Sequence, residues 1–291
     1  MRRLFVVIAV LGAVAVPAWA RYHYQAVTTV DGQGGEAGAI TVEAWIDGGK
    51  AKILFKESQN PLMGVGSYFL TVDGGKTLYL VNPTEGTYSE WNIDAMLGAV
   101  GGVMEAMGGF MKMEISDHKV EKLLEESGGS ILGYPTTHYR YRTSYTMEMK
   151  VMGMKRGDRH DSVQDIWTTT ALSDEGFGIW LQNKPKSTGF ETFDKLIEAE
   201  YQKVSGFPLK MVERTATAGV KKSGRTATTI TTMEVTMLEE TSVPGSTFEL
   251  DPALEEVPMM PLPGAMPVEE PEEDEEEEGG LFKKLKKRST G

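Results

Sequence analysis

The 291-residue chain has no cysteine. This excludes disulfides, thiolate nucleophiles, zinc sites with cysteine ligands and attachment of a lipid through a cysteine. Basic residues are also few, with 30 Lys and Arg against 42 Asp and Glu and a formal net charge of −12. Because nucleic-acid binding needs a basic surface, we expect no nucleic-acid partner.

Motifs for catalysis or metal binding are missing as well. The four histidines form neither an HExxH sequence nor a pair at i, i+4, and there is no G-x-S-x-G. Asp158, His160 and Asp161 could ligate a divalent ion, but they lie in a predicted polar hairpin turn near 156–158, which does not favour a metal site. We therefore expect no enzymatic activity, no cofactor and no metal. A pair of carboxylates brought together only by the fold is the remaining route to catalysis.

Only one long apolar run is present, at the N-terminus. Arg2 and Arg3 precede the apolar stretch 4–16, and Ala18-Trp19-Ala20 fits a signal-peptidase site. The stretch is shorter than the roughly 20 residues that span a bilayer. Residues 1–20 therefore predict a signal peptide. We expect the mature chain to be exported, periplasmic or envelope-associated, and soluble after cleavage.

Residues 22–92 predict a series of short strands. Those rich in β-branched and aromatic residues are 22–29, 39–46, 51–56, 68–72, 77–81 and 87–91. Two near-identical Asp-Gly-Gly-Lys sequences, at 47–50 and 73–76, are typical of hairpin turns. A phosphate-binding loop is not indicated, because the Walker spacing is absent.

Residues 94–113 predict a helix with one apolar face, rich in methionine and glycine. Such a segment adapts to irregular apolar partners, which favours a movable lid beside a ligand cavity. The alternative is a helix that fills the core. The candidate ligand contacts are five residues of this segment and two aromatic residues expected to point inward: Met96, Val100, Met104, Met107, Met111, Tyr79 and Trp91.

Further along the chain, we expect a charged helix at 116–126 that ends at Gly128-Gly129, and a second helix at 190–204. Strands are predicted between and after these helices, at 136–152, 163–171, 209–216 and 226–238.

The composition changes after residue 258. Prolines and the acidic run 269–278 predict a disordered tail over 259–291. Its end can place apolar and basic side chains on opposite sides of a short helix, as in segments that lie on anionic membranes. The candidate membrane-contact residues are Leu281, Phe282, Lys283, Lys284, Leu285, Lys286 and Lys287. The alternative is a solvated tail.

Several short sequences carry a resemblance to a known group: GGKAKI at 48–53, DGGKTLYLVNP at 73–83, Thr87-Tyr88 and GYPTTHY at 133–139. Residues 22–258 resemble exported bacterial proteins of a domain-of-unknown-function family with the lipoprotein-carrier-like fold of the Lol type. The resemblance implies an incomplete antiparallel barrel with helices over its concave face and an apolar cavity that, in the carriers, accepts acyl chains. The tail has no counterpart in it.

Together these observations predict an α+β fold: a strongly curved antiparallel sheet with helices on its concave face. The domains would be 1–20, 21–258 and 259–291. We expect a non-enzymatic envelope protein that binds an apolar ligand, such as a lipid or lipidated peptide, in the concavity, with possible peripheral contact to an anionic membrane. The alternative is an envelope scaffold protein with a filled core, whose charged tail recruits a partner.

Overall fold

A computed structural model describes residues 21–32, 38–60, 63–92, 95, 111–151, 154–172, 191–201, 205–219 and 226–258. The chain divides into two units, Met1–Val257 and Pro258–Gly291, and the fold described here is that of the first. The predicted signal peptide, the tail 259–291 and most of the Met/Gly segment lie outside the described residues.

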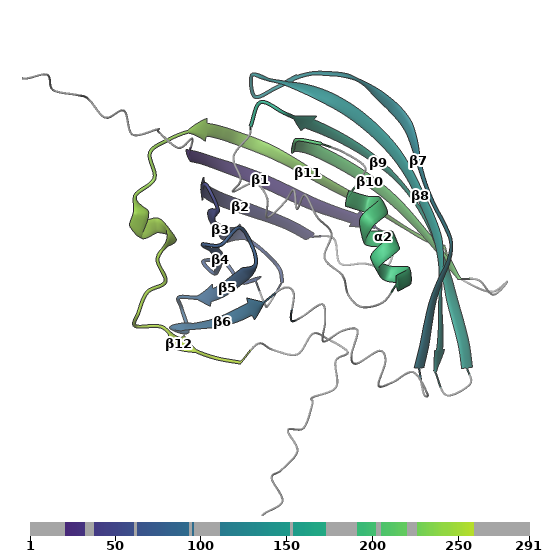
Figure 1. The fold of residues 1–291 in the computed structure, drawn as a ribbon, viewed down its shortest axis with the longest axis horizontal. Helices are drawn as coiled ribbons and strands as arrows, with labels where there is room; N and C mark the ends of the chain where they lie inside the picture. The colour runs from purple at the N-terminus through teal and green to yellow at the C-terminus, as the bar shows by residue number, and fades with distance from the viewer. Residues whose placement is uncertain are drawn as a thin grey trace, which may run out of the picture. The chain divides into compact units, whose positions relative to one another are not determined.

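The described strands form one sheet of 12 strands (Figure 1). Its order is β12-β6-β5-β4-β3-β2-β1-β11-β10-β9-β8-β7. The bounds are β1 Arg21–Gly32, β2 Gly38–Asp47, β3 Lys50–Glu57, β4 Tyr68–Thr71, β5 Thr77–Asn82, β6 Thr87–Asn92, β7 Met111–Ile131, β8 Tyr134–Val151, β9 Met154–Thr169, β10 Phe207–Gly219, β11 Thr226–Glu240 and β12 Glu255–Glu256. Neighbours run antiparallel except β12 and β6, which are parallel.

The predicted strands and the two Asp-Gly-Gly-Lys turns are confirmed. Gly48 and Gly74 have φ of 58° and 74°, the left-handed region that glycine tolerates. The two turns also contact each other, because the backbone N–H of Gly74 donates to the carbonyl of Gly49 at 2.7 Å. This contact joins the β2–β3 end to the β4–β5 end.

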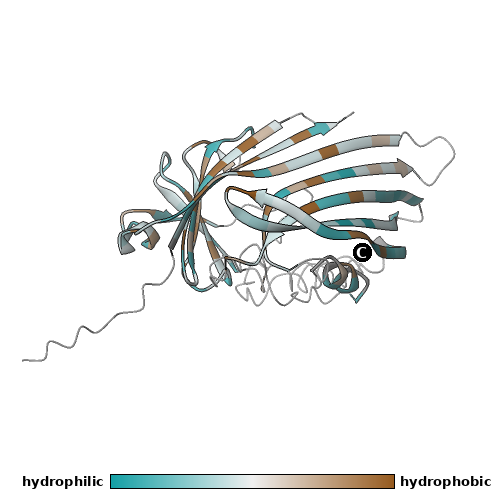
Figure 2. Ribbon diagram, turned by 90° about the horizontal axis from the view of Figure 1, so that it is seen from above, coloured by the Kyte–Doolittle hydropathy of each residue, from teal (hydrophilic) through white to brown (hydrophobic). Residues whose placement is uncertain are grey.

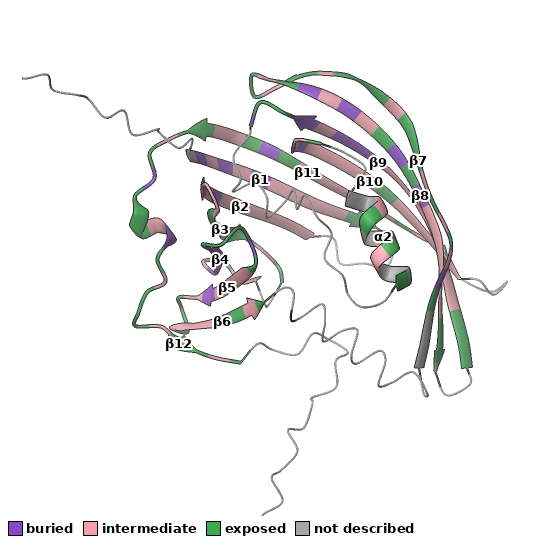
Figure 3. Ribbon diagram, viewed as in Figure 1, coloured by how far each residue is buried: buried purple, intermediate pink, exposed green. Residues whose placement is uncertain are grey.

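Hydrophilic and hydrophobic residues form bands along the strands (Figure 2), and successive side chains of a strand point to opposite faces of the sheet. The face that we call the core face carries a buried cluster built on Tyr22, Tyr24, Ile46, Ile53 and Leu209. The other face, the opposite face, is polar over β8–β10. Figure 3 shows the resulting bands of buried and half-buried residues along β8 and β9.

The opposite face carries a buried apolar cluster where the C-terminal segment crosses it. Residues 241–257, here called the strap, include the short 3₁₀ helix η3 (Gly245–Phe248) and β12. Val243 and Phe248 of the strap are buried against Tyr68, Leu70 and Val81. The strap thereby connects the end of β11 to the β6 edge.

The predicted fold class is wrong. The sheet is open, since its terminal strands β12 and β7 do not pair, and no described helix covers a concave face. The predicted helix 190–204 is confirmed as α2 (Glu191–Tyr201), which contacts β7. The predicted helix 116–126 is part of β7 instead, because pairing with β8 satisfies its backbone.

The predicted turn at 156–158 is also wrong, since these residues lie inside β9 and the hairpin closes where Val151 pairs with Met154. Across the described part of the chain, no helix has the length and apolar character needed to span a membrane.

Candidate functional site

Two uncharged cross-strand rows run over the core face and meet at β1. The first row follows the strand register from β4 to β1 through Phe69, Ile53, Ala44 and Tyr24. The second crosses β1, β11, β10, β9 and β8 through Thr28, Met233, Met211, Ile166 and Tyr139. Most of the first row is buried, whereas the second is half-buried except for Ile166.

The two aromatic residues predicted as ligand contacts lie on opposite faces. Trp91 pairs with Leu78, the neighbour of Tyr79, so the pleat separates the two side chains. Trp91 is on the core face, edge-to-face with Phe69 at a ring-centroid distance of 5.9 Å. Tyr79 packs against the cluster under the strap and against Tyr88. A single cavity in one face of the sheet therefore does not contact both.

The other candidates are only partly placed. Met96, Val100, Met104 and Met107 lie outside the described residues, as do Leu281 to Lys287 of the tail. Met111 is the first residue of β7 and its backbone pairs with Val151.

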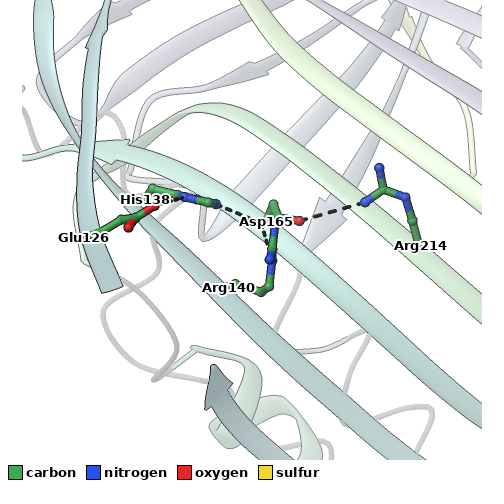
Figure 4. A network of polar contacts seen from close by, with 5 residues as sticks. All are labelled: Glu126, His138, Arg140, Asp165 and Arg214. Carbon is green, nitrogen blue, oxygen red and sulfur yellow. Dashed lines mark hydrogen bonds and ion pairs between the residues drawn. The ribbon is translucent and has the colours of Figure 1, made fainter. Parts of the chain in front are cut away.

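A polar network that the sequence analysis missed lies on the opposite face (Figure 4). Asp165 of β9 is 5% exposed and accepts hydrogen bonds from His138 Nε2 at 2.8 Å and Arg140 Nε at 2.7 Å. Arg214 Nη1 of β10 lies 3.9 Å from the second carboxylate oxygen. On the far side of the His138 ring, Nδ1 is 3.4 Å from Glu126 of β7. The network thus joins four neighbouring strands.

Burial and hydrogen bonding act in opposite directions on Asp165. Burial alone raises the pKa of its carboxyl group, but the hydrogen bonds from Arg140 and His138 outweigh it and lower the pKa below the usual value. The lowered pKa favours the ionised carboxylate, which accepts two hydrogen bonds at Oδ1 and lies near Arg214 at Oδ2.

A second network on β1–β3 and β11 has the same plan. His23 of β1 lies 2.9 Å from Glu43 of β2 and 3.1 Å from Glu239 of β11. Lys56 of β3 pairs with Glu43 at 3.1 Å. Burial raises the pKa of Glu43, but hydrogen bonds with His23 and Lys56 outweigh it and lower it overall.

The correspondence between the networks extends to an aromatic ring. In each, the histidine stacks on a tryptophan directly opposite on the next strand, and the carboxylate precedes that tryptophan by two residues. The sequence signal that could have found this is His-Tyr followed by acid-x-Trp, which occurs as His23-Tyr24 with EAW (43–45) and as His138-Tyr139 with DIW (165–167).

These networks are built to hold strands together. Each buried carboxylate is paired with cations of the chain, and no group of acidic and histidine side chains among the described residues could hold a metal ion. The opposite face over these strands is thus a scaffold, and the core face is the better candidate for ligand binding.

Comparison with known proteins agrees with the resemblance seen in the sequence. A family model described as a domain of unknown function (DUF4412) matches residues 67–253, more than half of the chain. The chain belongs to the DUF4412 family. The expectation that the chain belongs to a domain-of-unknown-function family is confirmed.

Three solved structures are similar to this DUF4412 chain. A LolA superfamily protein from Nitrosomonas europaea is 9% identical, with 80% of this chain and 91% of that chain covered and a TM-score of 0.30. An uncharacterized conserved protein from Thermus thermophilus is 6% identical, with 81% and 91% covered and a TM-score of 0.31. A DUF1329 family protein from Desulfovibrio piger is 9% identical, with 80% and 91% covered and a TM-score of 0.30. No curated protein matches the sequence.

Proposed function

We propose that this DUF4412 protein is a non-enzymatic, exported envelope protein that binds an apolar ligand, a lipid or acyl chain, on the core face of its sheet. In this proposal residues 1–20 are removed, residues 21–258 form the binding domain and 259–291 are an accessory tail. The observation that carries it is the second core-face row, Thr28, Met233, Met211, Ile166 and Tyr139.

The chemistry of this row suits an acyl chain. Its members are uncharged, and Met211 and Met233 are half-buried, so they retain surface that a ligand can cover. Methionine is polarizable and adapts to irregular apolar partners. Burial of an acyl chain here would contribute about 25 cal/mol for each Å² of apolar surface removed from water.

The test is lipid extraction and mass spectrometry on mature protein purified without detergent from an envelope fraction. We expect a stoichiometric acyl-chain species in the wild type and its loss in Met233→Glu, because a carboxylate on the core face is costly to desolvate beside an acyl chain. Thr232→Glu is the matched control. It adds the same charge one residue away, on the opposite face, where Thr232 pairs with Thr29 and Val212.

Folding of each variant is checked by circular dichroism and thermal melting. Met233→Ala, which removes contact area without adding charge, serves if Met233→Glu does not fold. A wild-type protein that carries no lipid and binds no apolar dye would contradict the proposal and favour a scaffold protein with a filled core.

A further inference from the structure

The end of the β8–β9 hairpin, together with the start of β7, extends past the described end of β10. Gly219, the last described residue of β10, pairs with Asp158 of β9. Beyond that point β9 continues to Met154 and remains paired with β8, which is paired in turn with the first residues of β7. We call residues 147–151 and 154–157 the hairpin tip.

Apolar side chains on one face of the tip are exposed. Met149 is 39% exposed and Met154 is 73% exposed. Met149 pairs with Arg156, and Met154 lies two residues before Arg156 on β9, so the two methionines are diagonal neighbours on one face, with Arg156 beside both. Two adjacent exposed methionines at the end of a hairpin are costly in water unless something covers them.

The other face of the tip is basic. Lys150 and Lys155 are exposed and lie directly opposite each other on β8 and β9. Like charges in this position destabilise a sheet, so the pair does not serve the stability of the hairpin. Lys155 also pairs with Glu148 at 2.6 Å, which leaves Lys150 without an ion-pair partner among the described residues.

The local charge is opposite in sign to that of the whole protein. Residues 147–160 hold four basic side chains, Lys150, Lys155, Arg156 and Arg159, against the acidic Glu148 and Asp158, in a chain whose net charge is −12. The tip thus presents apolar side chains next to basic ones. This combination complements a surface in which an apolar layer lies beneath a layer of negative charge.

We propose that the hairpin tip docks the protein on an anionic lipid surface. Met149 and Met154 enter the boundary between headgroups and acyl chains, while Lys150, Lys155 and Arg156 lie at the level of the lipid phosphates. This site is separate from the core-face rows and does not depend on them. It adds a means by which the protein meets a membrane, the place where an apolar ligand would be collected or delivered.

The test is co-sedimentation of the full chain with vesicles of equal parts phosphatidylcholine and phosphatidylglycerol, compared with pure phosphatidylcholine. We expect binding to the mixed vesicles only, weakened by added salt. Lys150→Gln with Lys155→Gln is expected to lower the partition coefficient by about fivefold for each lysine. Met149→Ser with Met154→Ser is expected to lower it by about tenfold.

Two control pairs match these changes elsewhere in the chain. Lys50→Gln with Lys76→Gln removes two exposed lysines from the Asp-Gly-Gly-Lys turns, and Val65→Ser with Val72→Ser removes two exposed apolar side chains, 65% and 48% exposed. Both pairs are expected to bind vesicles as the wild type does, and thermal melting verifies that every variant is folded.

The proposal is wrong if the wild type does not bind the mixed vesicles, or if the tip variants bind them as well as the wild type does. The second outcome would assign membrane binding to another part of the chain. Vesicle binding and lipid extraction are separate measurements. The proposal that the tip docks on membranes can therefore be disproved while ligand binding on the core face is confirmed, and ligand binding can be disproved while membrane docking is confirmed.

Discussion

His138 and Trp167 lie directly opposite each other on β8 and β9, with their rings parallel to within 1° and their centroids 4.2 Å apart. His23 and Trp45 repeat this arrangement on β1 and β2, at 5.2 Å and 5°. In both networks the histidine also contacts a carboxylate on each neighbouring strand. The same device therefore joins β7–β8–β9 and β11–β1–β2.

The two histidines should differ in their contribution to stability. His138→Leu leaves Asp165, 5% exposed at its side chain, with one hydrogen bond fewer, whereas His23→Leu affects Glu43, which is 15% exposed. We expect His138→Leu to lower the free energy of unfolding by about 2 kcal/mol, and His23→Leu by less, because the cost of an unsatisfied acceptor rises with burial. Urea denaturation of the two variants measures this, and the reverse order would show that burial of the carboxylate is not what matters.

The Asp165 network predicts a loss of stability in acid. The folded-state pKa of Asp165 lies below its ordinary value of 3.8, so the ionised carboxylate stabilises the fold above about pH 4. This contribution is lost as the pH falls through the folded-state pKa. We expect Asp165→Asn to be less stable than the wild type by about 2 kcal/mol near pH 7, with the difference shrinking as the pH falls below about 4.

Thermal melts of both proteins across this pH range are the measurement. Glu85→Gln, which neutralises an exposed carboxylate in the β5–β6 turn, is the control and should follow the wild type at every pH. A constant difference between wild type and Asp165→Asn over the whole range would mean that the ionised form of Asp165 has no special role in stability.

Much of the sheet could be predicted from local sequence, because period-2 alternation and the Asp-Gly-Gly-Lys turns are local signals. The assignment of 116–126 failed for an identifiable reason. β7 contains register shifts after Ser116, Lys122 and Ser127, and each shift moves the following side chains to the other face. The shifts interrupt the period-2 pattern of apolar and polar residues that is typical of a strand. The many Lys and Glu residues of this edge strand then resemble the sequence of a charged helix.

The site was harder to predict than the fold. Whether Tyr79 and Trp91 share a face depends on the register of β5 with β6, which residue types alone do not give. The pairing of β1 with β11 joins residues 197 to 218 positions apart, and it creates the row that contains Thr28 and Met233. Such long-range pairing has no signal in a local pattern.

One bulge in β7 has a tight steric requirement. At Gly128, a Cβ atom would lie 2.7 Å from Cδ1 of Trp167 and 3.1 Å from the backbone nitrogen of His138. We expect Gly128→Ala to displace Trp167 and lower the free energy of unfolding by about 1–3 kcal/mol. Gly64→Ala, where a Cβ meets nothing within 4 Å, should change stability by less than about 0.5 kcal/mol. Urea denaturation followed by tryptophan fluorescence compares them, and equal effects would contradict the close packing at Gly128.

The strap should stabilise the β6 edge of the sheet. Phe248 is 3% exposed within the cluster of Tyr68, Leu70 and Val81, and β12 follows it by donating from Glu255 N to Gly86 O at 2.9 Å. Phe248→Ala removes a buried aromatic side chain of the strap from this cluster, so we expect the free energy of unfolding to fall by about 3–5 kcal/mol.

Hydrogen exchange locates this effect. In Phe248→Ala, exchange is expected to be fastest at Glu255 and Val257, whose amides donate to Gly86 and Tyr88, while the amides of the β1–β11 pair stay more protected than those of the strap. Val72→Ala, which truncates a side chain that is 48% exposed near the β4–β5 turn, is the control and should leave the strap protected. Equal protection of the strap amides and the β1–β11 amides would instead mean that the strap and the central strands unfold as one cooperative unit.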